Sequence, residues 1–123
     1  MIIDDKEYRF HIRGNEFHCA LDVTANFIGG KWKAVVMWYL LGGKKRFVEL
    51  KRRIPAITDK MLSMQLRALE EDGFVKREVY AEIPPRVEYS LTEEGYTLEP
   101  VLWAMAAWGR GKAERHGTRV LVK

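Results

Sequence analysis

The sequence has very little cysteine: Cys19 is the only one among 123 residues. A single thiol cannot close an intramolecular disulfide, and chains without disulfides are typical of reducing compartments. Long apolar runs are also missing, and no charged leader precedes an apolar segment at the start of the sequence. These absences predict a soluble, cytoplasmic protein that does not enter a membrane.

Residues that catalyse reactions or bind metals are scarce as well. The three histidines, His11, His18 and His116, are dispersed, and no paired metal-ligand spacing occurs. Gly29-Gly30-Lys31 lacks the rest of a phosphate-binding glycine loop, so we interpret it as a helix break. We therefore expect no enzymatic activity, no cofactor and no metal site.

The charge that is present is unevenly distributed. The formal net charge is +4, and between Lys44 and Lys60 seven basic residues stand against two acidic ones. The first thirty residues instead hold five acids and three bases. Apolar residues make up 47% of a chain whose length suits a single core. A packed domain with one basic segment is typical of a protein that binds phosphates of nucleic acid.

Apolar periodicity and turn residues divide the chain into short elements. Thr58 is a suitable N-cap and Gly73 a suitable C-terminal stop for a helix that follows another helix and a tight turn. Pro100 fits either a kink or the first residue of a new helix. The predicted parts of the single domain 1–123 are an N-terminal arm (1–18), helices at 21–28 and 32–41, a helix-turn-helix (47–72), a wing (74–91) and C-terminal helices (92–117).

These parts predict an α+β fold, mainly α: a winged helix-turn-helix with a two-stranded wing and extra N- and C-terminal helices that form a dimer. In the helix 58–72, three leucines, Leu62, Leu66 and Leu69, share one face. The opposite face carries the predicted base-reading residues Lys60, Ser63, Met64 and Arg67.

Each side chain on that face has a chemistry that suits the major groove. Arg67 can bind guanine with two hydrogen bonds, Ser63 can pair with several base edges, and Met64 can contact a thymine methyl. The alternative is that Lys60 and Arg67 only solvate a surface. Contacts to phosphates or from the wing are predicted for Lys44, Lys45, Arg52, Arg53, Thr58, Arg77 and Arg86. For Arg86, an ion pair with Glu82 or Glu88 is an equal alternative.

Two helices are apolar on more than one side. The helix 32–41 and the segment 101–108 have almost no polar face, which predicts a partner chain or a ligand cavity beside them. An ordinary core is the alternative. The predicted dimer interface consists of Trp38, Val101, Leu102, Met105 and Trp108.

Four segments together resemble the HxlR-type family of winged-helix regulators. They are Ile28-Gly29-Gly30-Lys31-Trp32, Arg46-Phe47-Val48-Glu49-Leu50-Lys51, Leu66-Arg67-Ala68-Leu69-Glu70-Glu71-Asp72-Gly73, and Tyr80-Ala81-Glu82-Ile83-Pro84-Pro85-Arg86-Val87-Glu88-Tyr89-Ser90-Leu91-Thr92 followed by Gly95. The resemblance covers residues 19 to about 109. It implies a homodimeric transcription factor that binds an inverted repeat of double-stranded DNA, with the terminal helices forming the dimer.

Cys19 matches a position where many members of that family have Cys-Pro and some sense oxidants or electrophiles. Here Ala20 follows it. A redox role for Cys19 is one hypothesis, and an inert cysteine is the other. Upstream, the alternation of Tyr8, Phe10 and Ile12 predicts a strand that pairs with residues 120–122, within the chain or across the dimer.

The predicted function is thus a sequence-specific regulator of transcription that responds to a redox, electrophile or small-molecule signal. The expected partners are double-stranded DNA, a second copy of the chain and a small-molecule effector. The alternative is a winged-helix module that binds other proteins and not DNA. The clustered bases of residues 44–60 favour the DNA-binding interpretation.

Overall fold

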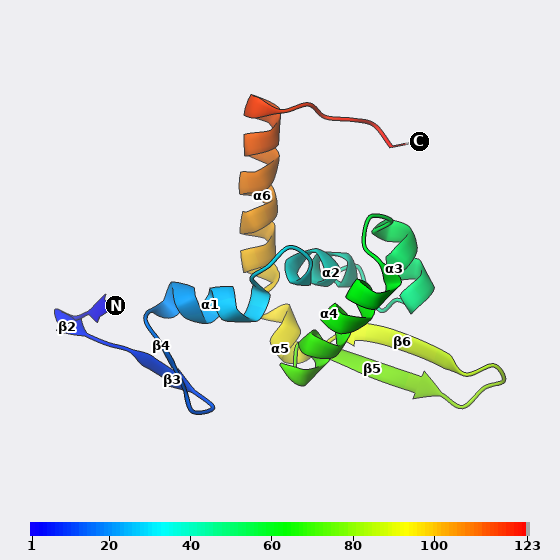
Figure 1. Ribbon diagram of the computed structural model, residues 1–123, viewed down its shortest axis with the longest axis horizontal. Coiled ribbons are helices and arrows are strands. Elements are labelled where there is room, and N and C mark those ends of the chain that lie inside the picture. Colours follow the sequence, from blue (N-terminus) through cyan, green and yellow to red (C-terminus); the bar gives the residue numbers. More distant parts are fainter. Residues whose placement is uncertain (123) are drawn as a thin grey trace.

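The computed structural model describes residues 1–122. Six helices and three separate two-stranded antiparallel sheets make up this part of the chain (Figure 1). The predicted class, α+β and mainly α with a winged helix-turn-helix, is confirmed. In chain order the elements are β1 (Ile2–Ile3), β2 (Lys6–Glu7), β3 (Phe10–Ile12), β4 (Asn15–Phe17), α1 (Ala20–Ile28), α2 (Lys33–Leu40), α3 (Phe47–Arg53), α4 (Asp59–Glu71), β5 (Val75–Tyr80), β6 (Arg86–Leu91), α5 (Glu93–Tyr96) and α6 (Glu99–His116).

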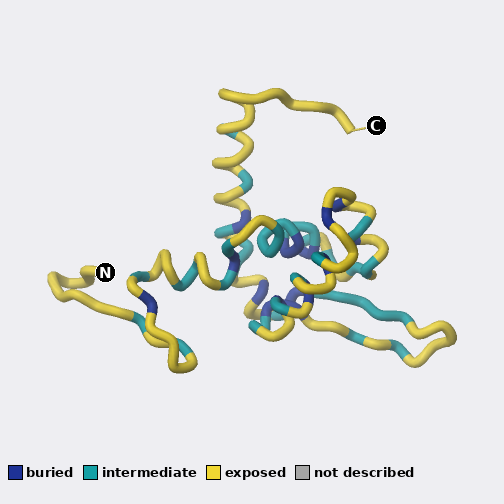
Figure 2. Tube along the Cα trace, in the orientation of Figure 1, coloured by how far each residue is buried: buried dark blue, intermediate teal, exposed yellow. Residues whose placement is uncertain are grey.

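Helix α2 lies at the centre of the core. Its side chains Val36, Met37 and Leu40 have no solvent exposure, and it packs against α3, α4, β6 and α6. The buried residues gather around α2 and α4, whereas the arm and the outer part of α6 are exposed (Figure 2). A helix apolar on several sides is therefore explained in part by neighbours within its own chain.

The turn between α3 and α4 is held by side chains that bond to the backbone. The carboxylate of Glu49 accepts a hydrogen bond from the backbone N–H of Arg46 at the start of α3 (3.0 Å). The ammonium of Lys51 donates to the carbonyls of Pro55 (3.2 Å) and Ile57. The Thr58 hydroxyl accepts from the backbone N–H of Met61 (3.1 Å), so it caps α4 as predicted. The first bond caps the start of α3, and the bonds of Lys51 and Thr58 hold the turn and the start of α4.

The wing is a regular hairpin whose register runs from Val75 opposite Leu91 to Tyr80 opposite Arg86. Pro84 and Pro85 lie in its loop, as predicted. Lys45 pairs with strand β6 through an isolated antiparallel bridge to Tyr89, which the sequence did not predict. Its backbone exchanges hydrogen bonds of 2.9 and 2.8 Å with that of Tyr89. This bridge ties the segment before α3 to the wing.

The two ends of the chain leave the body in different directions (Figure 1). Pro100 lies in the first turn of α6, so it begins a new helix and does not kink an existing one. Helix α6 continues to His116, beyond the predicted apolar segment, and its outer turns stand clear of the body (Figure 2).

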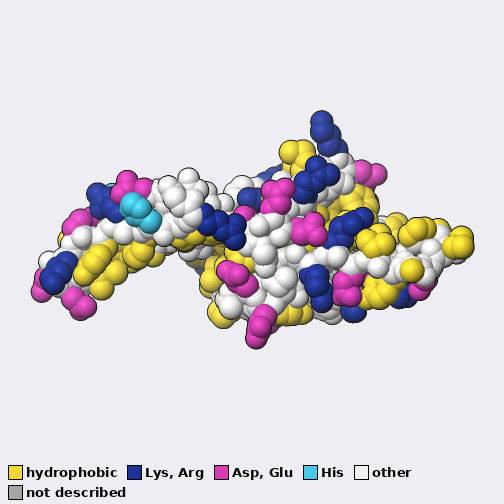
Figure 3. Space-filling view, turned by 90° about the horizontal axis from the view of Figure 1, so that it is seen from below, with side chains coloured by type: hydrophobic (Ala, Val, Ile, Leu, Met, Phe, Trp, Pro, Cys, Tyr) yellow, Lys and Arg dark blue, Asp and Glu magenta, His cyan; other side chains and the backbone are white. Residues whose placement is uncertain are grey.

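The N-terminal arm consists of two small hairpins, β1–β2 and β3–β4. The predicted pairing of residues 8–12 with 120–122 does not occur within this chain: Phe10–Ile12 pairs with Asn15–Phe17, and residues 120–122 form no strand. The last residue of the predicted tail, Lys123, lies outside the described residues. Hydrophobic side chains gather along one side of the arm (Figure 3).

Candidate nucleic-acid interface

Helix α4 has one buried and one exposed face. Leu62, Leu66 and Leu69 are 0 to 2% exposed in the core. The four predicted base-reading side chains are all exposed on the other face. There they line a shallow hollow of ≈ 600 Å³ together with Ala68 and Glu71: Lys60, Ser63, Met64 and Arg67. The structure therefore brings the predicted set together on one surface.

A second hollow, of ≈ 350 Å³, lies between α4 and the wing. Ser63, Arg67 and Glu70 line it from α4, and Arg77 and Tyr89 from the wing. Because Arg67 borders both hollows, it joins the exposed face of α4 to the wing. Two guanidinium groups in one hollow suit an anionic ligand such as a nucleic-acid backbone.

Tyr89 was missed as a site residue. The observed register sets it opposite Arg77. That Tyr89 lies beside α4 depends on how the hairpin packs on the helix. This long-range contact leaves no local signal in the sequence.

The predicted phosphate-binding residues differ in their exposure and in whether they already bond to other groups of the chain. Arg52 and Arg53 are exposed at the end of α3. Lys44 donates to the Tyr80 hydroxyl (3.3 Å), and this bond, with the nearby carboxylates of Glu78 and Glu88, raises the pKa of Lys44. Lys44 is therefore firmly cationic beside the last residue of β5, near the loop of the wing.

Lys45 and Thr58 have local partners. The ammonium of Lys45 is half-buried and donates to the Gly43 carbonyl (3.4 Å). The Thr58 side chain is exposed, but its oxygen already accepts the capping bond of α4. Of the predicted set, Arg52, Arg53 and Arg77 are exposed and form no ion pair within the described residues.

Arg86 is engaged within the wing. Its guanidinium lies 3.4 Å from Glu82 and 3.8 Å from Glu88, and 4.1 Å from the centre of the Tyr80 ring. Of the two alternatives for this residue, the structure contains the ion pairs. A guanidinium held by two carboxylates and an aromatic face is a weak candidate for a phosphate contact.

The predicted dimer residues divide into two groups. Leu102 is 2% exposed and belongs to the core of its own chain, so its side chain offers no surface to a partner. Val101 is half-buried against the same core. Met105 and Trp108 are 47% and 68% exposed on α6.

Trp38 contacts an aromatic residue that the prediction omitted. Its ring meets that of Trp103 edge to face, with centroids 4.9 Å apart. Trp103 is itself 57% exposed. The apolar character of segment 101–108 was the signal for Trp103, which lies on the side of α6 that faces Trp38.

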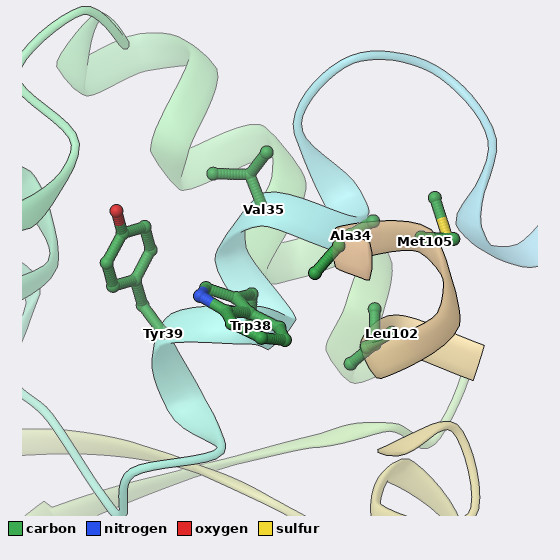
Figure 4. A pocket seen from close by; sticks show the side chains of 7 residues that line it. Ala34, Val35, Trp38, Tyr39, Leu102 and Met105 are labelled. Atoms are coloured by element: carbon green, nitrogen blue, oxygen red, sulfur yellow. The ribbon is translucent and has the colours of Figure 1, made fainter. Parts of the chain in front are cut away.

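An open apolar cavity of ≈ 320 Å³ lies between parts of α2 and α6 (Figure 4). Trp38 and Tyr39 line it from α2, and Met105 from α6. The other lining residues are Ala34, Val35, Leu102 and Ala106. Because α2 also packs against α4, this cavity lies one helix away from the candidate DNA surface.

Cys19 is half-buried at the N-terminal end of α1, where it occupies the cap position. The adjacent backbone N–H of His18 donates to the carboxylate of Asp22 (3.0 Å). In residues 1–122, no group of three or more His, Cys, Asp or Glu side chains could hold a metal ion. None of the helices described is long and apolar enough to cross a membrane.

Residues 27–117 match the family described as HxlR-like helix-turn-helix. The chain belongs to this family. The match contains every element from α2 to α6, the wing included, which confirms the resemblance seen in the sequence motifs.

Similar proteins are named as regulators. The HTH-type transcriptional regulator YybR of Bacillus subtilis is 48% identical over 116 residues, 92% of this chain and 93% of its own. YdeP of the same organism is 52% identical over 97 residues, 79% of this chain and 76% of its own.

Solved structures give the same result. The oxidized form of the redox regulator HypR superposes with a TM-score of 0.73 at 48% identity, covering 84% of this chain and 100% of that one. The reduced form of YodB from B. subtilis has a TM-score of 0.65 at 36% identity, covering 80% and 93%. As an HxlR-type winged-helix protein, the chain is a DNA-binding regulator of transcription.

Proposed function

We propose that this HxlR-type protein binds an inverted-repeat operator as a homodimer, in the cytoplasm, with α4 in the major groove of each half-site. The observation that carries this proposal is the position of Arg67, which lines both the hollow on α4 and the hollow between α4 and the wing. Recognition helices read bases from such an exposed face while neighbouring cations hold the phosphates.

Dimerisation follows from the size of the reading surface. One helix reads few base pairs, and two symmetry-related helices read two half-sites about 34 Å apart. The exposed apolar side chains Met105 and Trp108 share one face of α6 and supply a surface that a second copy can cover. Two copies related by a twofold axis match a palindromic operator.

In this proposal Lys60, Ser63, Met64 and Arg67 contact bases, and Arg52 and Arg53 contact phosphates. An electrophoretic mobility shift on a selected operator tests the division. Arg67→Ala is expected to weaken binding by ~1–3 kcal/mol and to relax preference at one base pair. Arg53→Ala is the matched control, and should weaken all sequences alike and flatten the salt dependence by about one phosphate contact.

Two results would contradict the proposal. Identical behaviour of Arg67→Ala and Arg53→Ala would show that α4 does not read bases through Arg67. Binding that is independent of salt, or no preference for an inverted repeat over a single half-site, would favour a module that binds other proteins.

Regulation by a small apolar effector is supported by the cavity between α2 and α6. A ligand bound there would contact α2 and could shift it, and α2 packs directly against α4. The class of ligand that fits is a small, largely apolar molecule with an aromatic or aliphatic body, because aromatic, aliphatic and thioether side chains line the cavity. A shift in operator affinity on adding such a molecule, lost in Ala106→Trp, would support this role.

Regulation through Cys19 is a second candidate mechanism, favoured by the likeness to HypR, which is named a redox regulator. Since the chain has one cysteine, oxidation by diamide would join two Cys19 thiols from separate copies into a disulfide, with two electrons and two protons passing to diamide. Diamide should alter operator binding by the native chain but not by Cys19→Ser. Equal responses of the two proteins would exclude Cys19 as the sensor.

A further inference from the structure

The N-terminal arm carries an apolar face that its own chain leaves uncovered. Ile2, Ile3 and Tyr8 are 69%, 41% and 42% exposed, and the hydrophobic side chains follow one side of the arm (Figure 3). The arm joins the body mainly through β4 and the start of α1. Isolated two-stranded hairpins are marginally stable in water, so this face requires a partner.

The turn at the tip of the arm holds two acids, Asp4 and Asp5, followed by one exposed base, Lys6. Asp4 and Asp5 form the two-residue turn between β1 and β2, with φ angles of 52° and 64°, a conformation that aspartate tolerates. Within residues 1–122 neither carboxylate is in an ion pair, whereas nearby Glu7 is bonded to the N-terminal amine and to Arg9, which lower the pKa of Glu7. The arm therefore presents an apolar side that ends in two unpaired negative charges.

The outer half of α6 has the complementary pattern. Met105, Trp108, Lys112 and Arg115 follow one another at spacings of three and four residues, so they share one face of the helix. Met105 and Trp108 are exposed, and Lys112 and Arg115 form no ion pair in the part of the chain that is described. The face thus runs from apolar to cationic toward the free end of α6.

The acidic residue near this end of α6, Glu114, already forms ion pairs. Glu114 lies between Arg119 and Arg110, whose hydrogen bonds lower its pKa and keep it ionised. Its single negative charge is shared by those two arginines, so the charges of Lys112 and Arg115 are left uncompensated.

We propose that the arm of one protomer docks on the outer half of α6 of a second copy. The apolar side of the arm covers Met105 and Trp108, and the acidic tip meets Lys112 and Arg115. The inference rests on the proposed homodimer and adds the segment that completes it. The occupant is a second copy because the two complementary surfaces belong to one chain, in which the arm and the free end of α6 project apart (Figure 1). Twofold symmetry forms the contact twice per dimer.

Photo-crosslinking tests the contact directly. The full chain with Tyr8→p-benzoylphenylalanine is mixed with unmodified, ¹⁵N-labelled chain, allowed to exchange subunits, irradiated and digested. Mass spectrometry is expected to find Tyr8 joined to labelled peptides from residues 103–116. The control is the same substitution at Val79, an exposed wing residue, which should give no such product. Crosslinks confined to one chain, crosslinks to other regions, or none would overturn the proposal.

A double-mutant cycle tests the charges. Lys112→Gln with Arg115→Gln should raise the dimer dissociation constant by about three- to tenfold, the range for exposed ion pairs. Asp4→Asn with Asp5→Asn should do the same, since asparagine also tolerates the turn. In the asparagine background the glutamine pair should have no further effect. Additive losses would overturn the ionic contact.

The two hypotheses can fail separately. A native chain that is monomeric by analytical ultracentrifugation, alone and on operator DNA, would refute both the homodimer and the docked arm. A stable native dimer whose dissociation constant is unchanged by removal of residues 1–9 would refute the docked arm alone. That truncation leaves the β3–β4 hairpin and the buried Phe17 in place.

Discussion

The DNA-facing half of the chain, from α2 to β6, and its periphery, the arm and α6, use apolar residues differently. In the first half, Leu62, Leu66 and Leu69 are buried and the opposite face of α4 is mostly polar. In the periphery, large side chains such as Ile2 and Trp108 are 69% and 68% exposed. The leucine face of α4 is buried within one chain, whereas the exposed side chains of the periphery are those that we propose a second copy covers.

This difference separates two kinds of stability. Burial inside one chain contributes a free energy that does not depend on concentration. Burial between two copies contributes only when the copies meet, so it grows with protein concentration. Substitutions in the two regions should therefore differ in whether dilution changes their effect.

The largest effect is expected at Leu66, which is 2% exposed under α4. Leu66→Ala removes buried methyl groups and leaves a cavity, so the free energy of unfolding should fall by ~2–5 kcal/mol. Urea denaturation followed by tryptophan fluorescence measures this loss. The loss should be the same at low and high protein concentration.

Its neighbour Arg67 is the matched control, because it is exposed on the same helix. Arg67→Ala should leave the unfolding free energy within about 0.5 kcal/mol while weakening operator binding. If Arg67→Ala destabilised the fold as much as Leu66→Ala, the division of α4 into a packing face and a reading face would be wrong.

A smaller effect, dependent on concentration, is expected at Trp108. The native chain should show a melting temperature that rises with protein concentration, because dimerisation stabilises the folded state. Trp108→Gln removes an exposed aromatic side chain from the proposed interface, so it should cost about 2 kcal/mol of dimer stability and flatten this rise. Scanning calorimetry over a hundredfold dilution series measures it. Val79→Gln in the wing, also exposed, should leave the rise unchanged.

The sequence predicted the DNA-facing half better than the periphery. Helix α4 was located correctly because its cap, Thr58, and its stop, Gly73, act locally, and Gly73 has the expected left-handed φ of 83°. In the arm, a strand was expected at residues 8–12 and is observed at residues 10–12, but its partner was not expected. The turn Arg13-Gly14, both residues with positive φ, closes a hairpin that was overlooked.

The features that sequence reasoning missed depend on contacts between distant segments. The bridge from Lys45 to Tyr89 joins residues far apart in the chain, and no sequence pattern around either residue predicts it. The burial of Leu102 depends on how α6 packs against α2, and the apolar pattern could not tell this inner side from the exposed side of Trp108. Periodicity shows that a side chain is apolar, but not which surface covers it.

The smallest effect is expected at Arg86. This residue is a cation on the DNA-facing half, but acids of its own chain already pair with it. Its ion pairs with Glu82 and Glu88 and its contact with Tyr80 are partly exposed, so Arg86→Gln should cost less than about 1 kcal/mol of unfolding free energy.

Operator affinity should respond even less to Arg86→Gln, and the slope of log affinity against log salt should not change, because a paired guanidinium displaces no counterions from DNA. Arg53→Gln is the comparison, since Arg53 is exposed at the end of α3 and should flatten that slope by about one contact. A slope flattened equally by Arg86→Gln would mean that the guanidinium leaves Glu82 and Glu88 when DNA binds. The wing would then depend on its partner for its arrangement, as the arm and α6 are proposed to do.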